Sequence, residues 1–392
     1  MREWLADVVV CPVCRGRLGL RPTRFLSYRG TGDRRIAEGV LSCAACREDY
    51  PIIGSIPRLV PPKQLTAKER AVAERLARHK GPPEEATAAP PTAEEIRERL
   101  EAIIRDQYAA PDEDAAWHRD WLERQSTYLL HYEPERLKHI RTVEPYLEGP
   151  IRSVLEVGGG RGGNLGVLMR ETGAAHGVAI EILENSCEMA LLREPETEII
   201  RADAHALPLA DRAFDFVMSA MVLEHLADWR RGALEMARVA RQGYIVYTPN
   251  GAFIYDHGHL GAPLNAYVPR SLAVTIATAF NRLRRTGRTR EGIKQTLDEI
   301  NVVPRRRLSK LLAAHGVASR PLFERLMHYA VLVEKPYTTP GIKRLLRAHP
   351  SLTFFVGRAL TLLGVEPVVS LYFRQNEPLR GRSPGRSFGQ RV

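Results

Sequence analysis

Short hydrophobic runs and longer amphipathic segments alternate from about residue 150 to residue 250. The runs are bounded by turn residues and predict strands over 151–157, 175–180, 198–202, 213–219 and 243–248. Two more runs, near 317–323 and 329–333, predict a final antiparallel hairpin. Strands that alternate with helices in this way predict a parallel sheet between helices, with any ligand outside the carboxyl ends of the strands.

The pattern of hydrophobic and polar positions divides the chain into four parts. Residues 24–30 and 34–43 predict two strands around a turn at 31–33, within a small domain over residues 1–60. Residues 61–110 form a proline-rich linker with helices, which we expect to be solvated. The α/β domain covers 111–338 with a helical insertion at about 251–301, and residues 339–392 form a C-terminal helical extension with a disordered tail.

Two features of the linker region predict helices. Thr92 followed by Glu95 has the spacing of a capping box. Trp117, Trp121 and Tyr128 follow at helical spacing, so they face one side of a helix. Packing against the next domain is the expected role of this aromatic face, and a lid over a substrate pocket is the alternative.

The surplus of positive charge is local. The chain holds 57 Lys and Arg against 46 Asp and Glu, a net charge of +11. Residues 281–350 alone hold 16 basic and 5 acidic residues, whereas residues 61–280 hold 25 and 33. The charge therefore does not by itself indicate a nucleic-acid-binding protein, because most of the chain is mildly acidic.

No segment predicts export or membrane insertion. Acidic residues lie within the first seven positions, which is atypical of a secretory signal. The most apolar stretch, 351–373, is interrupted by Arg358, Glu366 and Pro367. We therefore expect a soluble cytoplasmic protein, with residues 352–363 forming a buried amphipathic helix or, alternatively, a helix that lies on a membrane surface.

Four of the five cysteines form two Cys-x-x-Cys knuckles, namely Cys11, Cys14, Cys43 and Cys46. Four thiolates complete a closed tetrahedral Zn²⁺ site. A site without an open position has a structural role, and a domain of 60 residues needs such support. There are two alternatives. A pair of disulfides is disfavoured by a reducing cytoplasm, and a redox Cys-x-x-Cys would not need a second copy.

The knuckles, together with the ending Tyr50 to Leu59, resemble the small zinc-ribbon subunit that activates tRNA and release-factor methyltransferases. The resemblance covers about residues 1–60. It implies a zinc ribbon fused to whatever enzyme follows, where relatives use a separate activator subunit.

The strongest functional pattern is a glycine-rich loop after the first predicted strand of the α/β domain. The sequence from Val154 to Asn164 reads VLEVGGGRGGN, in which an acid precedes the first glycine by two residues. Glycine allows tight turns and close approach of a ligand. The acid distinguishes this loop from a dinucleotide-binding loop, and the pattern resembles motif I of class I S-adenosylmethionine-dependent methyltransferases over about residues 110–338. It implies a Rossmann-like seven-stranded domain.

That resemblance assigns cofactor contacts. Glu156 would orient the loop and the ammonium group, and the backbone of Gly158, Gly159, Gly160 and Gly162 would underlie the methionine and ribose. Asp203 and Ala204 match the pair that recognises adenine.

The acid that binds the ribose hydroxyls in this family is missing from its usual position. Ala179 stands there instead, and Glu181 follows two residues later on the same face of the strand. Glu181 is the candidate ribose ligand.

Catalytic candidates follow the fourth and fifth strands of the domain. His225 would act as a general base beside Glu224, or the pair would cap a helix or pack on the cofactor. Asp256, His257 and His259 form a second polar cluster. We expect these side chains to face solvent in a surface loop, and a metal site is the alternative. The arginines from Arg282 to Arg307 would hold a phosphate-bearing or other anionic ligand, or only face solvent.

These features predict an S-adenosylmethionine-dependent methyltransferase that acts on O or C of a small-molecule acceptor. The alternative is a tRNA or translation-factor methyltransferase whose fused ribbon is its activator, although nucleic acid is not favoured. The Asn-Pro-Pro-Tyr signature of amide and exocyclic-amine N-methylation is absent, since Ser219 to Val222 read SAMV. A third class is a silent cofactor-binding scaffold, which the intact loop and Asp203 disfavour. The acceptor and the oligomeric state are not predicted.

Overall fold

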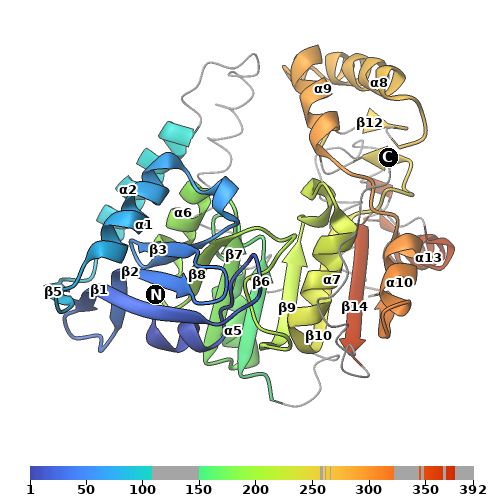
Figure 1. Cartoon of the computed structure of the whole chain (residues 1–392). Coiled ribbons are helices and arrows are strands. Elements are labelled where there is room, and N and C mark those ends of the chain that lie inside the picture. The colour runs from blue at the N-terminus through green and yellow to red at the C-terminus, as the bar shows by residue number, and fades with distance from the viewer. Residues whose placement is uncertain are drawn as a thin grey trace.

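The computed structural model describes residues 1–107, 150–256, 259–260, 262–264, 266–321, 344–345, 348–364 and 368–375. The aromatic residues at 117–132 and the strand expected at 329–333 lie outside these ranges. Figure 1 shows two regions joined by one sheet, with a helical lobe that stands over one end of it.

The N-terminal region is a short 3-10 helix followed by an antiparallel sheet. The predicted hairpin is confirmed, and each strand pairs with the next in chain order. The elements are η1 (Glu3–Asp7), β1 (Leu18–Tyr28), β2 (Arg34–Cys43), β3 (Asp49–Ile53) and β4 (Ile56–Leu59).

The linker is not merely solvated, which corrects the expectation from its composition. It contains η2 (Pro62–Gln64), α1 (Ala67–Arg78), β5 (Glu84–Ala88) and α2 (Ala93–Gln107). Helix α1 packs on β2 and β3 and buries Ala73 and Leu76, and β5 pairs with β1. The predicted capping box is confirmed, because Thr92 and Glu95 exchange hydrogen bonds at the start of α2.

The α/β region has the predicted alternation. Its strands are β6 (Ser153–Val157), β7 (His176–Glu181), β8 (Glu198–Ala202), β9 (Phe214–Ala220) and β10 (Ala240–Pro249). These five strands are parallel, in the order β10-β9-β6-β7-β8. The helices between them are α5 (Leu165–Thr172), α6 (Glu184–Arg193) and α7 (Trp229–Val239).

The end of this sheet differs from the prediction. The strand beside β10 is β14 (Val368–Gln375), which is antiparallel and pairs in turn with β13 (Val317–Pro321). We expected the domain to end at residue 338 and the rest to be a helical extension with a tail. The run VVSLYF in β14 instead fills the sheet, burying Leu371 and Phe373, because two antiparallel partners satisfy its backbone.

The insertion between β10 and β13 forms a helical lobe, as predicted. Helices α8 (Arg270–Leu283) and α9 (Arg290–Glu299) pack together over a small core of their own, with the short strands β11 (Tyr255–Asp256) and β12 (Ala262–Pro263). The lobe stands over the carboxyl ends of β9 and β10 (Figure 1). Helix α10 (Arg305–Ala313) then returns to the sheet and packs on α7.

Helix α13 (Pro350–Leu363) was expected to be buried, and the structure corrects this. Phe355 is 70% exposed and Leu362 is 75% exposed among the described residues. None of the helices in the described ranges is long and apolar enough to cross a membrane.

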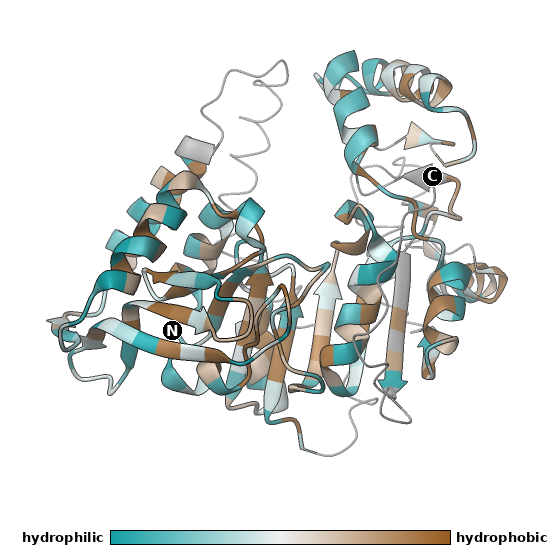
Figure 2. Cartoon of the chain, viewed as in Figure 1, coloured by the Kyte–Doolittle hydropathy of each residue, from teal (hydrophilic) through white to brown (hydrophobic). Residues whose placement is uncertain are grey.

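One sheet runs through both regions. Strand β4 pairs in parallel with β8, Arg58 opposite Arg201 and Leu59 opposite Ala202. Twelve of the fourteen strands in the described part of the chain therefore form one sheet, in which β4 and β8 make the seam. In Figure 2 hydrophobic residues gather in the strands of this sheet, while polar residues dominate the outer faces of the helices.

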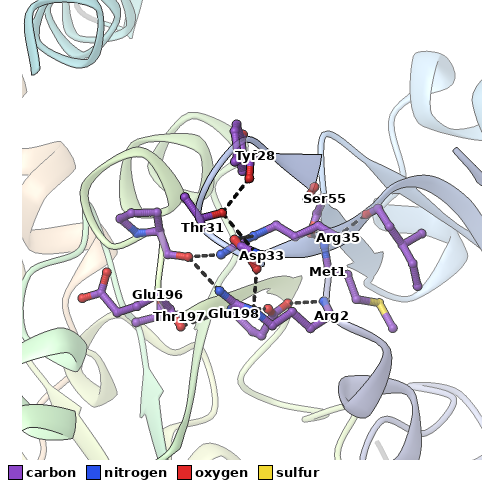
Figure 3. A network of polar contacts seen from close by, with 12 residues as sticks. Met1, Arg2, Tyr28, Thr31, Asp33, Arg35, Ser55, Glu196, Thr197 and Glu198 are labelled. Carbon is purple, nitrogen blue, oxygen red and sulfur yellow. Dashed lines mark hydrogen bonds and ion pairs between the residues drawn. The ribbon is translucent and has the colours of Figure 1, made fainter. Parts of the chain in front are cut away.

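Charged side chains reinforce the seam (Figure 3). Arg2 donates to the Glu198 carboxylate at 2.8 Å, and Arg35 reaches the carbonyl oxygen of Pro195. Asp33 accepts from both arginines and holds them in place. The two regions are therefore joined by backbone pairing and by buried or half-buried ion pairs.

Candidate functional site

The glycine-rich loop turns between β6 and α5. The amides of Gly158 and Gly159 both donate to the carbonyl oxygen of Ile180, at 2.8 and 2.9 Å, and so fix the loop against β7. Gly158 has φ +77°, and a side chain there would meet Val222 Cγ2 at 2.1 Å. The loop requires glycine at this position for both conformation and space.

Gly160 differs from its neighbours. It has φ +53°, and a Cβ there would meet no atom within 4 Å. The open space beside this residue is a cradle at the carboxyl end of β6. Asn164 donates to the buried carboxylate of Glu156 at 2.7 Å, which ties the start of α5 to the end of β6.

Glu181 supports the loop from the end of β7. Its carboxylate accepts from the amide of Gly160 at 2.9 Å and from the amides of Ile182 and Leu183 at 2.7 and 2.9 Å. Ala179 is buried, and its Cβ fills the space beside Gly159. Ala179 thus packs the loop from below, and the only carboxylate on this strand lies one pleat farther on.

Asp203 follows β8, beside the buried Ala204. Its carboxylate accepts from Gln64 Nε2 at 2.8 Å and from the amide of His205 at 2.8 Å, and it contacts His205 Nδ1 at 2.7 Å. Burial opposes ionisation, but these hydrogen bonds outweigh it and lower the pKa of the Asp203 carboxyl. Sequence reasoning missed Gln64 and His205, and for Gln64 no local pattern signals a partner 139 residues away.

Exposed apolar side chains surround the loop. Leu183 is 54% exposed after β7, and Met221 is 40% exposed after β9 with φ +59°. Together with the Gly160 cradle and the Asp203 carboxylate, they offer an apolar wall, space beside the backbone and a hydrogen-bond acceptor. An apolar wall beside open space and a hydrogen-bond acceptor fits an adenosyl cofactor.

Glu224 and His225 lie in η4 (Leu223–His225), directly after β9. Glu224 is fully buried, and its carboxylate accepts from the Thr248 hydroxyl at 2.8 Å. His225 is exposed as a residue, yet partial burial of its ring and the nearby His259 lower the pKa of His225. The pair does not cap the following helix, because Asp228 caps α7.

Of the second polar cluster, the structure describes the side chain of His259. His257 lies outside the described residues and no side-chain position is described for Asp256. His259 instead meets His225, with ring centroids 5.3 Å apart at 81°. The ligand atoms of Glu224, His225 and His259 all lie within 4.8 Å of one another.

The four cysteines of the two knuckles come together as predicted. Sγ of Cys11 lies 3.5 Å from that of Cys46, and Cys14 and Cys43 are equally close. Sulfurs 2.3 Å from one zinc ion are about 3.8 Å apart. The cluster therefore fits Zn²⁺ in a closed, structural site.

Both knuckles also have the same backbone geometry. Arg15 and Arg47 follow them with φ of 60° and 63°, and each donates its amide to the carbonyl of the first cysteine of its knuckle. Arg15 further pairs with Glu235 of α7 at 2.5 Å. The metal-binding turn thus contacts the α/β region directly.

Several arginines of the basic segment have structural partners. Arg305 and Arg306 donate to the carbonyl oxygens of Thr361 and Leu363 at the end of α13. Arg288 donates to the carbonyl oxygen of His259 at 2.9 Å. These three residues hold the lobe and α13, which reduces the set available for an anionic ligand.

Two family models match the chain. Residues 155–248 match the methyltransferase domain, and residues 3–55 match the Trm112p-like protein family. The first match spans β6 to β10 and contains every cofactor candidate except the linker contacts. The second contains all four cysteines.

Curated relatives match the same region. The chain is 33% identical over 123 residues to a probable S-adenosylmethionine-dependent methyltransferase of Mycobacterium tuberculosis, which is 31% of this chain and 43% of the relative. It is 37% identical over 98 residues, 24% of this chain, to an uncharacterized methyltransferase of Mycobacteroides abscessus, of which it covers 37%. The chain thus spans less than half the length of these relatives.

A solved structure resembles a larger part of the chain. The complex between the Haloferax volcanii Trm112 methyltransferase activator and a methyltransferase aligns with 68% of this chain and 100% of that chain, with 12% identity and a TM-score of 0.40.

Proposed function

We propose that this chain, which carries a methyltransferase domain and a Trm112p-like zinc-ribbon domain, is an S-adenosylmethionine-dependent methyltransferase with its ribbon fused in the same polypeptide. The observation that carries the proposal is the open space at Gly160, whose amide donates to the Glu181 carboxylate at the end of the strand beside β6. S-adenosylmethionine supplies an electrophilic methyl group. The protein aligns the acceptor with it and excludes water.

Each cofactor residue has a proposed role. Glu156 and Asn164 hold the loop and face the ammonium group, and the backbone of Gly158, Gly159, Gly160 and Gly162 underlies the methionine and ribose. Glu181 holds the ribose or the loop that carries it, while Asp203 and the backbone of Ala204 recognise adenine. Contacts from Gln64 and His205 support the placement of Asp203.

The acceptor that we favour is a small molecule methylated at O or C. The sequence SAMV after β9 lacks the signature of amide N-methylation, and the exposed Met221 and the lobe offer an apolar approach to the loop. In this proposal His225 and Glu224 lie on the acceptor side. The arginines of 282–307 that do not hold the lobe or α13 remain a proposed site for an anionic part of the acceptor.

A tRNA or translation-factor acceptor is the second candidate. It is supported by the Trm112p-like ribbon, whose family resemblance is to an activator of such enzymes. The surplus of basic residues at 281–350 also supports a polyanionic partner.

Binding and transfer are tested separately. Calorimetry should show one S-adenosylmethionine per chain, and Asp203→Asn should weaken it about tenfold, or about 1.4 kcal/mol. Absence of binding to the zinc-loaded protein would refute the proposed function.

Labelled S-adenosylmethionine with a cell extract then distinguishes the acceptors. Label that enters solvent-extractable compounds supports a small molecule, whereas label lost on ribonuclease or protease treatment supports the second candidate.

A further inference from the structure

Glu224, His225 and His259 come from distant parts of the chain and meet at one point. Glu224 and His225 follow β9, and His259 belongs to the lobe between β11 and β12. Their ligand atoms lie within 4.8 Å of one another. Such a meeting of two imidazoles and a carboxylate brings together three groups that bind metal ions.

Described contacts hold the Glu224 carboxylate and the backbone at His259 in place. The Thr248 hydroxyl donates to Glu224 at 2.8 Å and orients the buried carboxylate. On the lobe side, Arg288 donates to the His259 carbonyl oxygen at 2.9 Å. The neighbouring Leu260 is buried in the core of the lobe, where Asn281 donates to its carbonyl oxygen at 3.0 Å. His259 is therefore positioned by folded structure on both sides.

We propose that Glu224, His225 and His259 bind one divalent transition-metal ion, distinct from the zinc of the ribbon. Two nitrogen donors and one carboxylate oxygen form a donor set that suits Zn²⁺ or Fe²⁺ rather than Mg²⁺ or Ca²⁺. Donors at about 2.0–2.2 Å from a shared ion lie about 3–3.5 Å apart, so ion binding requires the longest separation in the cluster to shorten by up to about 1.3–1.8 Å. The Thr248 hydroxyl would then hold the Glu224 carboxylate in the orientation that binds the ion.

The exposure of the three ligands shows on which side the ion would have coordination positions that the protein does not fill. Glu224 is fully buried, His259 is half-buried and His225 is exposed. Three protein ligands leave further coordination positions, and these face away from the buried side. Val222, which fills the space beside Gly158, lies only three residues before His225. The open positions therefore lie near the proposed cofactor site.

This location assigns a role that rests on the proposed methyl transfer. An acceptor hydroxyl held beside the ion has a lowered pKa and releases its proton to water. Its oxygen forms a bond to the methyl carbon, and the bond from that carbon to sulfur breaks with both electrons remaining on sulfur. In this role His225 is a ligand and not the general base.

The site also ties the lobe to the α/β region. The amide of Asn301 donates to the Glu224 carbonyl oxygen at 2.6 Å, and its side chain donates to the Leu226 carbonyl oxygen at 2.8 Å. The chain thus leaves the lobe directly beside the cluster. A bound ion adds a third connection through His259.

Metal content tests the site without any assay of methyl transfer. The zinc-loaded chain is treated with a mild chelator, which strips open sites before a closed four-cysteine site, and is then titrated with Co²⁺. We expect one equivalent of Co²⁺ beyond the ribbon zinc, with an absorption spectrum that lacks intense thiolate charge transfer. His259→Ala and the more conservative His259→Gln should each weaken Co²⁺ binding at least tenfold.

His315→Ala is the matched control, because His315 is exposed on the turn after α10, outside the cluster. It should keep the extra equivalent. The proposal is overturned if the wild-type chain takes up no metal beyond the ribbon zinc, or if both His259 variants retain full affinity. Unchanged ribbon zinc and melting temperature show that the variants are folded.

Cofactor binding on the same samples separates this proposal from the proposed function. His259→Ala should bind S-adenosylmethionine within about twofold of wild type, because His259 belongs to the lobe, between β11 and β12, and not to the glycine-rich loop after β6. Loss of S-adenosylmethionine binding in the wild-type chain would refute the methyltransferase function and leave the metal result standing.

Discussion

At the scale of single residues, the loop after β6 separates two uses of glycine. Gly158 and Gly162 sit where any Cβ would strike a neighbour, Val222 in one case and Ala190 in the other. Gly160 has a left-handed backbone but open space around it. Packing therefore explains the first two glycines, whereas the open space at the third leaves room for a ligand.

Gly160→Ala tests this reading. We expect it to lower the free energy of unfolding by about 1 kcal/mol, because alanine is strained at positive φ. The added methyl group enters the space proposed for the cofactor, so S-adenosylmethionine affinity should fall about tenfold or more in calorimetry.

Gly173→Ala is its control. Gly173 ends α5 with φ +70° and is equally open, but it lies at the opposite end of that helix from the loop. The control should lose similar stability and keep its affinity. Equal loss of affinity in both variants would contradict a cofactor cradle at Gly160.

Glu194 predicts a pH effect at the same loop. It is buried and accepts from the amide of Gly166 at 2.8 Å, and burial raises the pKa of its carboxyl above the ordinary 4.5. A raised folded-state pKa favours the protonated form, so this contribution to stability is complete below pH 4.5 and is lost as pH rises through the folded-state value.

Urea unfolding between pH 4.5 and 8 measures the contribution of Glu194 to stability. The stability of Glu194→Gln relative to wild type should increase as pH rises and then level off. The exposed Glu171 provides the control variant Glu171→Gln, for which the difference should stay flat. A flat curve for Glu194→Gln would show that Glu194 is not held in a raised-pKa environment.

The sequence predicted those sites whose residues lie close together along the chain. The knuckles place both cysteines of a pair within one turn, and the acid-glycine spacing lies within one loop. Prediction failed for Gln64 and His259, because their contacts with Asp203 and His225 depend on how distant elements pack. Glu181 was predicted as a ribose ligand, and its hydrogen bond from the Gly160 amide was not foreseen.

At the scale of elements, the five parallel strands were predictable because each is buried on both faces and reads as a short apolar run. Strand β14 was not, because its run lies within a longer apolar stretch that begins in α13, and nothing local shows that it pairs with β10. Helices were expected in the linker, but the packing of α1 on the ribbon depends on Glu69 and on partners far along the chain.

The ion pairs of Glu69 should make a large contribution to the free energy of that packing. Glu69 is buried in the first turn of α1, accepts from Arg201 at 2.9 Å and lies 3.4 Å from Arg58 Nε. Glu69→Ala leaves two buried guanidinium groups without their shared carboxylate. We expect the free energy of unfolding to fall by about 3–5 kcal/mol in guanidinium titrations.

The same helix offers an exposed pair for comparison. Glu74 lies 3.3 Å from Arg78, and both are more than two-thirds exposed. Glu74→Ala should cost no more than about 0.5 kcal/mol. Similar losses in the two variants would mean that the buried pairs at Glu69 do not stabilise the seam.

At the scale of the whole molecule, the continuous sheet links metal binding to the α/β fold. The ribbon needs zinc to hold its knuckles, and its strand β4 covers the edge of β8. Removing zinc should therefore do more than unfold the ribbon.

We expect chelation to lower the melting temperature of the entire chain in one calorimetric transition. Amide hydrogen exchange should accelerate in β8 as well as in the ribbon, while β14 at the far side keeps its protection. If β8 stayed protected and the melting temperature held after zinc loss, the two regions would be independent in stability.

The seam between β4 and β8 has one more consequence, which follows from the covalent link between the regions. A sheet edge left open invites pairing with other chains. When the covering strand is tethered, its effective concentration at the edge is in the millimolar range, regardless of how much protein is present. This seam therefore stays closed at dilutions that would separate two subunits, and it tolerates weakening substitutions that would split a two-chain complex.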